Sequence, residues 1–116
     1  MKKLILTRGI QGSGKSTWAR QWVEEDPENR VRINNDDIRN MLGKYWVVER
    51  EPLVSEMKQY LTQAAMDRGY DIVIDNMNLN PKEVKSWKRA VELNNENPDG
   101  YKYEIEFKDF FIPLEE

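Results

Sequence analysis

A glycine-rich segment near the N-terminus combines the residue types that bind phosphate. It runs from Gly9 to Ser16 (GIQGSGKS) and fits the pattern G-x-x-x-x-G-K-[ST] at every fixed position. Glycines let backbone N–H groups turn toward phosphate oxygens, the lysine supplies positive charge to the β- and γ-phosphates, and the serine hydroxyl can ligate magnesium. The predicted phosphate-binding residues are Gly9, Gly12, Ser13, Gly14, Lys15, Ser16 and Thr17. The segment therefore predicts a site for a nucleoside triphosphate, ATP with Mg²⁺.

A carboxylate later in the chain is a candidate second ligand for that magnesium. Asp75 directly follows an apolar triplet at 72–74 that is typical of a buried strand. In parallel α/β sheets, an aspartate at the carboxyl end of a strand beside the phosphate loop reaches the metal, often through water. We therefore predict that Ser16 and Asp75 bind Mg²⁺. The alternative is that Asp75 only caps a helix or turn where the strand ends.

A third cluster has the residue types needed to activate an alcohol acceptor. Phosphoryl transfer to a hydroxyl needs a group that accepts its proton, and the chain contains no histidine and no cysteine. A carboxylate is then the favoured base, and Asp36 and Asp37 follow a predicted strand. Arg39 lies one helical turn after Asp36 and can face the same way, so that a guanidinium would lie beside the carboxylate. The alternative is that Asn35, Asp36 and Asp37 cap a helix, or that one aspartate caps while the other is catalytic.

A parallel sheet is needed to bring these three clusters together. Apolar runs and turn residues predict strands at 3–8, 30–34, 71–75 and within 101–111, and helices at 15–25, 36–42, 52–68 and from Pro81 onward. Strands that alternate with helices indicate a mostly parallel sheet of about four strands, covered on both faces. With the phosphate loop placed between a strand and a helix, the expected fold is the three-layer α/β sandwich of P-loop NTPases.

Apolar stripes on the helices predict which faces turn toward the sheet. The predicted inner stripes are Trp18, Trp22 and Val23 in the first helix, Leu53, Met57, Leu61, Ala64 and Ala65 in helix 52–68, and Val84, Trp87 and Val91 in the last helix. A second stripe in the last helix is basic (Lys82, Lys85, Lys88 and Arg89), and the interspersed glutamates favour a solvated surface.

Length and charge limit the classes of protein. The 116 residues fit one domain, and the net charge of −3 argues against a protein that coats nucleic acid. A local basic site at Arg30, Arg32 and Arg39 is still compatible with binding of one nucleic-acid end. Trp46 could stack on an acceptor base, or pack at the edge of the domain. The chain has no apolar run of about eighteen residues and no long apolar stretch at its start, which predicts a cytoplasmic protein.

Taken together, the motifs resemble the kinase domain of phage-type 5′-hydroxyl polynucleotide kinases. The similar segments are 1–7 (MKKLILT), 12–20 (GSGKSTWAR), 33–39 (INNDDIR) and 78–81 (NLNP). The resemblance covers essentially the whole chain, and the last three segments are specific in combination. It implies ATP-dependent phosphoryl transfer to the 5′-hydroxyl of a nucleic acid end, in a bacterial or phage-infected cell.

The resemblance also assigns roles to individual residues. Asp36 matches the general base of the family, and Arg39 matches the arginine that binds the acceptor's phosphate next to the attacked 5′-hydroxyl. Lys15 and Ser16 match the residues that hold the ATP phosphates. The family often has Asp-Thr before Asn-Leu-Asn-Pro, where this chain has Asn76-Met77 with Asp75 one place earlier.

The end of the chain departs from the family pattern. Members of the family continue past a stretch comparable to Phe111-Ile112-Pro113 into an arginine-bearing lid helix and a final strand, whereas this sequence ends at Glu116. The expectation is one kinase domain over 1–116, truncated at its C-terminus, with the lid and last strand missing. Two alternatives stay open: a small-molecule or nucleotide-sugar kinase of the zeta-toxin-like kind, and an ATP-binding remnant or partner module without transferase activity.

Overall fold

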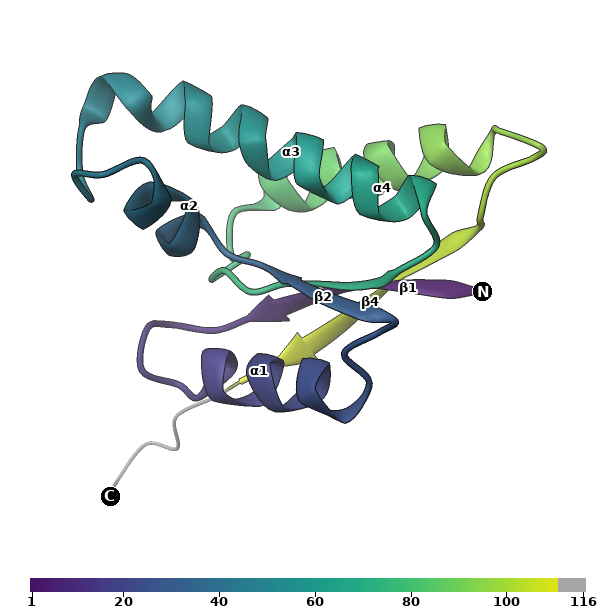
Figure 1. The fold of residues 1–116 in the computed structure, drawn as a ribbon, viewed down its shortest axis with the longest axis horizontal. Helices are drawn as coiled ribbons and strands as arrows, with labels where there is room; N and C mark the ends of the chain where they lie inside the picture. Colours follow the sequence, from purple (N-terminus) through teal and green to yellow (C-terminus); the bar gives the residue numbers. More distant parts are fainter. Residues whose placement is uncertain (111–116) are drawn as a thin grey trace.

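Strands and helices alternate along residues 1–110, the part of the chain that the computed structural model describes (Figure 1). The elements are β1 (Lys2–Arg8), α1 (Lys15–Glu25), β2 (Arg30–Ile33), α2 (Asn35–Met41), the 3₁₀ turn η1 (Val48–Arg50), α3 (Glu51–Asp67), β3 (Asp71–Ile74), α4 (Pro81–Asn95) and β4 (Tyr103–Asp109). All the predicted strands and helices are present, with small shifts at their ends. The stretch at 111–113 that entered the family comparison lies outside the described residues.

The four strands form one parallel sheet in the order β2-β3-β1-β4. Ile74 of β3 pairs with Leu6 of β1 on one side and with Ile33 of β2 on the other. Because all the strands run in the same direction, their carboxyl ends meet at one edge of the sheet. The phosphate loop, α2 and the loop at 75–80 all begin at this edge. The predicted parallel α/β architecture is confirmed.

Helices cover both faces of the sheet, as predicted. Figure 1 shows α1 on one face and α3 and α4 on the other. Under α1, the buried side chains of Ile5, Val73 and Ala19 form a small core that Trp18 and Trp22 flank. The two indole rings stack with their centroids 6.2 Å apart, so the predicted tryptophan stripe does face the sheet.

The larger core lies between the sheet and the other helices. Its buried members include Leu4, Leu6, Ile33, Ile72, Ile74, Ile38, Trp87 and Val91. Burying one such large apolar side chain contributes about 1.5–3 kcal/mol, so this layer is the main source of stability. Of the three residues of α4 that the sequence predicted to face inward, Trp87 and Val91 are buried and Val84 is partly buried.

The predicted inner face of α3 is partly right, since Ala65 is buried and Met57 packs against the larger core, but it is wrong at both leucines. Leu53 and Leu61 are 44% and 46% exposed. The buried residues of this helix are Val54, Lys58, Thr62, Ala65 and Met66. Two polar residues therefore occupy inward positions, and their polar atoms are accommodated locally. Thr62 Oγ1 donates a hydrogen bond to the Lys58 carbonyl at 2.8 Å. The Lys58 ammonium lies 5.7 Å from the centre of the Trp87 ring. Leu53 and Leu61 are consequently left on the outside of α3.

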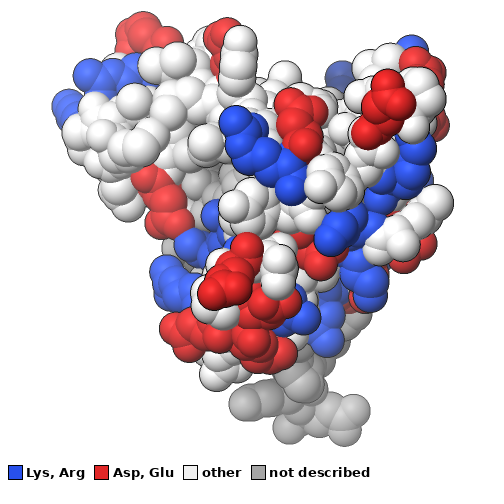
Figure 2. Space-filling model, turned by 45° about the vertical axis from the view of Figure 1, so that its right-hand side comes forward, with Lys and Arg blue, Asp and Glu red and all other residues white. Residues whose placement is uncertain are grey.

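The charged surface is mixed rather than of one sign. Figure 2 shows acidic and basic side chains interspersed over the viewed face. Within residues 1–110, no helix is both long enough and apolar enough to span a bilayer.

Candidate nucleotide and acceptor site

The phosphate loop connects the end of β1 to the start of α1. Gly12 and Gly14 have φ angles of 81° and 96°, a left-handed conformation that glycine adopts without steric cost. Gly14 is the N-cap of α1, no side chain caps the helix, and its first turn contains no acidic residue. The first backbone N–H groups of the helix and its positive dipole end are therefore directed at the loop, which is the arrangement that binds an anion.

Two residues of the loop, Lys15 and Ser13, direct polar groups inward: the Lys15 side chain is buried, and Ser13 is partly buried with its hydroxyl oxygen inaccessible. The ammonium of Lys15 donates a hydrogen bond to the Ile10 carbonyl at 2.7 Å, which holds it against the loop. The hydroxyl of Ser13 is buried and has no hydrogen-bond partner among residues 1–110. The Lys15 ammonium and the Ser13 hydroxyl, which has no partner among residues 1–110, suit a polar, anionic ligand such as a phosphate chain.

An asparagine to which the sequence reasoning assigned no role fixes the position of the loop. Asn78 is buried with φ 52°, and its amide donates to the carbonyls of Thr7 at 2.6 Å and Ile74 at 2.9 Å. The backbone N–H of Gly9 donates to the Met77 carbonyl at 3.1 Å. The ends of β1 and β3 are thus tied together under the phosphate loop. Asparagine tolerates the left-handed conformation better than most residues. The first asparagine of the Asn-Leu-Asn-Pro motif could therefore have indicated a tight turn at this position.

Asp75 lies at the end of β3, the strand beside β1, and its side chain is 1% exposed. Arg32 Nε donates to Asp75 Oδ2 at 2.7 Å, and Arg32 Nη1 contacts Asp37 Oδ2 at 2.5 Å. Asp75 does not cap the following helix, because Asn80 does. The second carboxylate oxygen, Asp75 Oδ1, is buried without a partner among residues 1–110.

These residues fit a magnesium ion that is held mainly by its substrate. Within residues 1–110 there is no group of three or more histidine, cysteine or acidic residues that could hold a metal. Mg²⁺ usually takes one or two protein ligands together with phosphate oxygens and water. Ser16 in the first turn of α1 and the unpaired Oδ1 of Asp75 suit this mode. Neither Ser16 nor Lys15 contacts Asp75 through a hydrogen bond or ion pair in the described part of the chain.

Arg32 links three elements of the site, which predicts a structural cost for its removal. Arg32→Ala would leave the buried Asp75 carboxylate uncompensated, so we expect the free energy of unfolding to fall by about 3 kcal/mol. Urea unfolding followed by tryptophan fluorescence would measure the loss. The matched control is Arg89→Ala, which breaks an exposed pair with Glu92 at 3.4 Å and should cost less than about 1 kcal/mol. Equal losses in the two variants would contradict this role of Arg32.

Helix α2 contains the candidate base, Asp36. Its N-cap is Asn34, which was not among the predicted caps. The side chain of Asn34 accepts a hydrogen bond from the Asp37 backbone N–H at 3.0 Å and donates to the Asp75 carbonyl at 2.5 Å. The interpretation of Asn35, Asp36 and Asp37 as caps is therefore wrong. Asn34, one position earlier, directly follows β2 and takes the capping position.

Asp36 and Arg39 face each other, as their spacing predicted. Arg39 Nη1 donates to Asp36 Oδ1 at 2.8 Å. The phenol of Tyr45 donates to the same oxygen at 2.7 Å. This hydrogen bond to the Asp36 carboxylate raises the pKa of the Tyr45 phenol, so the phenol keeps its proton at neutral pH. Among residues 1–110, no donor is hydrogen-bonded to Asp36 Oδ2, which leaves that oxygen free to accept a proton.

Arg39 also binds a second carboxylate with the rest of its guanidinium. Nη2 and Nε donate to the two carboxylate oxygens of Glu51 at 2.6 Å and 3.1 Å. This bidentate pair raises the pKa of Arg39 and lowers that of Glu51, so both groups stay charged. The rings of Tyr45 and Trp46 lie 5.9 Å and 5.6 Å from the same guanidinium, and Trp46 is largely exposed.

The predicted local basic site is not a free patch. Arg30 pairs with Glu25 at 3.5 Å, while Arg32 and Arg39 are held by the carboxylates described above. Sequence proximity of the arginines did not reveal these acidic partners, several of which come from distant segments. A ligand at this site would meet an arginine already oriented by acidic groups rather than a cluster of free cations.

The phosphate loop lies between strand β1 and helix α1, and polar residues follow the neighbouring strands β2 and β3. This arrangement defines a P-loop nucleotide-binding domain of the kinase-like class. Residues 4–96 match a protein-family model described as an AAA domain. The match covers most of the chain, which therefore belongs to this family.

Known relatives place the domain near polynucleotide kinases. The chain is 29% identical over 111 residues to a putative bifunctional polynucleotide kinase/RNA ligase of Autographa californica nuclear polyhedrosis virus, covering 81% of this chain and 15% of the relative. It is 30% identical over 99 residues to midasin of Dictyostelium discoideum, covering 82% of this chain and 2% of midasin. The chain thus spans only a small part of these relatives.

Solved structures agree with the family assignment. The chain superposes on a protein of the Pnkp1/Rnl/Hen1 complex with a TM-score of 0.78 and 27% identity, covering 97% of this chain and 36% of that one. An APS kinase of Mycobacterium tuberculosis has a TM-score of 0.64 at 13% identity, covering 98% of this chain and 81% of that one, a likeness that shows the fold alone. The chain is therefore a P-loop kinase-like domain related to polynucleotide kinases.

Proposed function

We propose that this domain transfers the γ-phosphoryl group of ATP to the 5′-hydroxyl of a nucleic acid end. The observation that carries the proposal is the Asp36 carboxylate, whose Oδ1 is held by Arg39 and Tyr45 while Oδ2 accepts no hydrogen bond within residues 1–110. Asp36 belongs to the helix that follows β2, at the same sheet edge as the phosphate loop. A base and a phosphate loop at one edge are the two parts that phosphoryl transfer to an alcohol needs.

The nucleotide half of the reaction belongs to the phosphate loop. Backbone N–H groups of Gly12 to Ser16 bind the β- and γ-phosphate oxygens, and Lys15 neutralises their charge. Ser16 and Asp75 would hold Mg²⁺, and a magnesium ion bound there would supply positive charge to the phosphates. Arg32 fixes the Asp75 carboxylate in position through Oδ2, which leaves Oδ1 without a partner among residues 1–110 as the oxygen that could bind the metal.

The acceptor half belongs to α2 and the segment after it. Asp36 Oδ2 takes the proton of the acceptor hydroxyl as the hydroxyl oxygen bonds to the γ-phosphorus, and the bond to the β-phosphate oxygen breaks to release ADP. Arg39 binds the phosphate next to that hydroxyl, because a guanidinium that holds the carboxylate of Glu51 bidentately also fits a phosphate. The exposed ring of Trp46 beside Arg39 is placed to stack on the terminal base.

The relatives support this choice of acceptor over a small alcohol. The viral relative is named for polynucleotide kinase activity, and the structural relative belongs to a complex described in a second structure as an RNA repair complex. A direct experiment compares transfer to a nucleoside with transfer to the same nucleoside 3′-phosphate. The Arg39 clamp predicts a lower Michaelis constant for the phosphorylated acceptor, whereas equal constants would favour a small-molecule kinase.

Tyr45 is expected to position the base without contacting ATP. Tyr45→Phe removes one hydrogen bond to Asp36 Oδ1, so kcat should fall by roughly threefold to tenfold, the usual value of one such bond. The Michaelis constant for ATP should not change. Tyr60→Phe is the matched control, because the Tyr60 phenol is exposed on α3 and has no role in this account. An unchanged kcat in Tyr45→Phe would remove Tyr45 from the proposed mechanism.

Magnesium binding can be tested without any acceptor. Ser16→Ala and Asp75→Asn should each weaken ATP binding by about tenfold in Mg²⁺, and much less in EDTA, because each removes one contact to the metal. Isothermal titration calorimetry in the two buffers measures the difference. Asp37→Asn serves as control, since it loses the other carboxylate bound by Arg32 and no proposed metal ligand. Equal effects of Asp75→Asn in the two buffers would show that Asp75 has only a structural role.

A further inference from the structure

Asn76 directly follows Asp75 at the carboxyl edge of the sheet and lies between the two halves of the proposed active site. Its amide oxygen accepts a hydrogen bond from the backbone N–H of Asn35, the first residue of α2, at 3.0 Å. Its backbone carbonyl accepts one from Thr7 Oγ1 at 3.0 Å, near the end of β1. Asn76 therefore connects the strand that leads into the phosphate loop with the residue that precedes Asp36.

The contact with Asn35 determines the orientation of the Asn76 amide. A backbone N–H needs an acceptor, so the amide oxygen must face Asn35 and the NH₂ group must point the other way. The nitrogen of this group, Nδ2, is buried and has no hydrogen-bond partner among residues 1–110. Because a buried donor without an acceptor is unfavourable, Nδ2 is a position at which an acceptor group would bind.

The donor character of Nδ2 determines the kind of ligand that suits it. A metal ion needs a lone pair, and a metal-bound water directs its hydrogens away from the metal, so neither suits an NH₂ group. A phosphate oxygen is a charged acceptor and does suit it. In phosphoryl transfer to an alcohol, the terminal phosphate of the nucleotide lies between the phosphate loop and the base. This is the region that the contacts of Asn76 with Thr7 and Asn35 span.

We propose that Asn76 Nδ2 donates a hydrogen bond to the γ-phosphate of the bound nucleotide and thereby makes the site discriminate a triphosphate from a diphosphate. This inference rests on the proposed function, because it takes the γ-phosphate to lie between Lys15 and Asp36. Asn76 adds a neutral donor to the positive charge of Lys15. Since ADP has no γ-phosphate, the contact contributes to the affinity for ATP alone.

Two substitutions at Asn76 test the contact, with the affinities for ATP and ADP measured by calorimetry in EDTA. EDTA removes the metal, to which an introduced carboxylate would bind. Asn76→Asp keeps the oxygen that accepts from Asn35 but loses the donor, and Asn76→Ala loses both. Each variant should bind ATP at least about tenfold more weakly, the usual effect of losing a hydrogen bond to a charged group. The affinity for ADP should change by less than about twofold, because ADP does not reach Nδ2.

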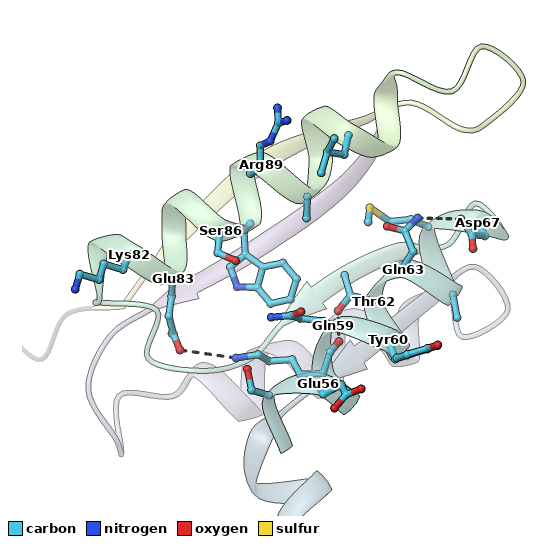
Figure 3. Close-up of a pocket in the computed structure, with 17 residues that line it drawn as sticks. Glu56, Gln59, Tyr60, Thr62, Gln63, Asp67, Lys82, Glu83, Ser86 and Arg89 are labelled. Atoms are coloured by element: carbon cyan, nitrogen blue, oxygen red, sulfur yellow. Dashed lines mark hydrogen bonds and ion pairs between the residues drawn. The ribbon is translucent and has the colours of Figure 1, made fainter. Parts of the chain in front are cut away.

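Gln59→Glu is the control for a change from an amide to a carboxylate. Gln59 lies on α3 in a groove of about 930 Å³ between α3 and α4, whose lining contains no residue of the phosphate loop (Figure 3). This substitution should leave both affinities unchanged.

The comparison of ATP with ADP in one protein separates a phosphate contact from a structural role. The side-chain oxygen of Asn35 is also buried without a partner among residues 1–110. If Nδ2 serves this oxygen instead, the substitutions weaken ATP and ADP equally, and the proposal is overturned. It is also overturned if either variant, folded by circular dichroism, binds ATP as tightly as the wild-type chain. A chain that transfers no phosphoryl group but shows the ATP-specific loss contradicts the proposed acceptor reaction and retains the Asn76 contact.

Discussion

Asp36→Asn is expected to lower transfer to a 5′-hydroxyl oligonucleotide by about 10²-fold or more, the usual value of a positioned base. The substitution keeps an oxygen that can accept the hydrogen bonds of Arg39 and Tyr45, but it removes the proton acceptor. Asp36 does not cap α2, because Asn34 does, so we expect the free energy of unfolding to be nearly unchanged. The affinity for ATP should also be unchanged, because the base acts on the acceptor.

The control for this prediction is the neighbouring aspartate. Asp37→Asn removes a carboxylate from the same helical turn, where it contacts Arg32 rather than Arg39. Single-turnover transfer with labelled ATP, together with calorimetry of ATP binding, measures both variants. If Asp37→Asn is inactive while Asp36→Asn transfers normally, the base has been placed one residue away from its true position.

Lys15→Ala should weaken ATP binding by at least about tenfold, or roughly 1.4 kcal/mol. It should further slow transfer by about 10²- to 10³-fold, because the ammonium also stabilises charge that develops on the phosphoryl group. Lys15 belongs to a polar loop, and its removal leaves only the Ile10 carbonyl without this donor. Lys85→Ala on the exposed face of α4 is the matched control for loss of a positive charge. Unchanged affinity in a folded Lys15→Ala protein would refute the phosphate-loop assignment.

Much of the fold could be predicted from local signals. Short apolar runs that end in glycine or aspartate identified the strands, and their alternation with helices gave the parallel sheet. The pairing of Asp36 with Arg39 followed from helical periodicity alone. These features depend on residues close together in the sequence, which is why the sequence revealed them.

The features that the sequence did not reveal depend on contacts between distant segments. On α3, Lys58 and Thr62 can turn inward because the lysine ammonium lies over the Trp87 ring and the threonine hydroxyl donates a hydrogen bond to its own helix. The spacing of apolar residues carries no information about either contact. The prediction therefore placed Leu53 on the inner face of the helix. The segment at 44–51 has no clear periodicity. The sequence therefore did not predict that Tyr45 and Glu51 contact Arg39.

The network around Arg32 is a second example. The sequence analysis placed Arg32 in a local basic site with Arg30 and Arg39. In the structure it bridges Asp37 and the buried Asp75, which lies 43 residues further along the chain. A pattern with a period of two places Arg32 on the face covered by α1, but it does not indicate which carboxylate arrives there from the neighbouring strand.

Transfer of the γ-phosphoryl group from labelled ATP to oligonucleotides tests the central claim most directly. The reaction should use an oligonucleotide with a 5′-hydroxyl, the same oligonucleotide with a 5′-phosphate, and a free nucleoside, in long incubations with Mg²⁺. The proposed function predicts label at the 5′ end of the first oligonucleotide, none on the 5′-phosphorylated one, far less on the nucleoside, and loss of the label in Asp36→Asn. Label on the nucleoside but on neither oligonucleotide would contradict the claim in favour of a small-molecule kinase. No label on any acceptor, with ATP binding intact, would identify a nucleotide-binding module without transferase activity.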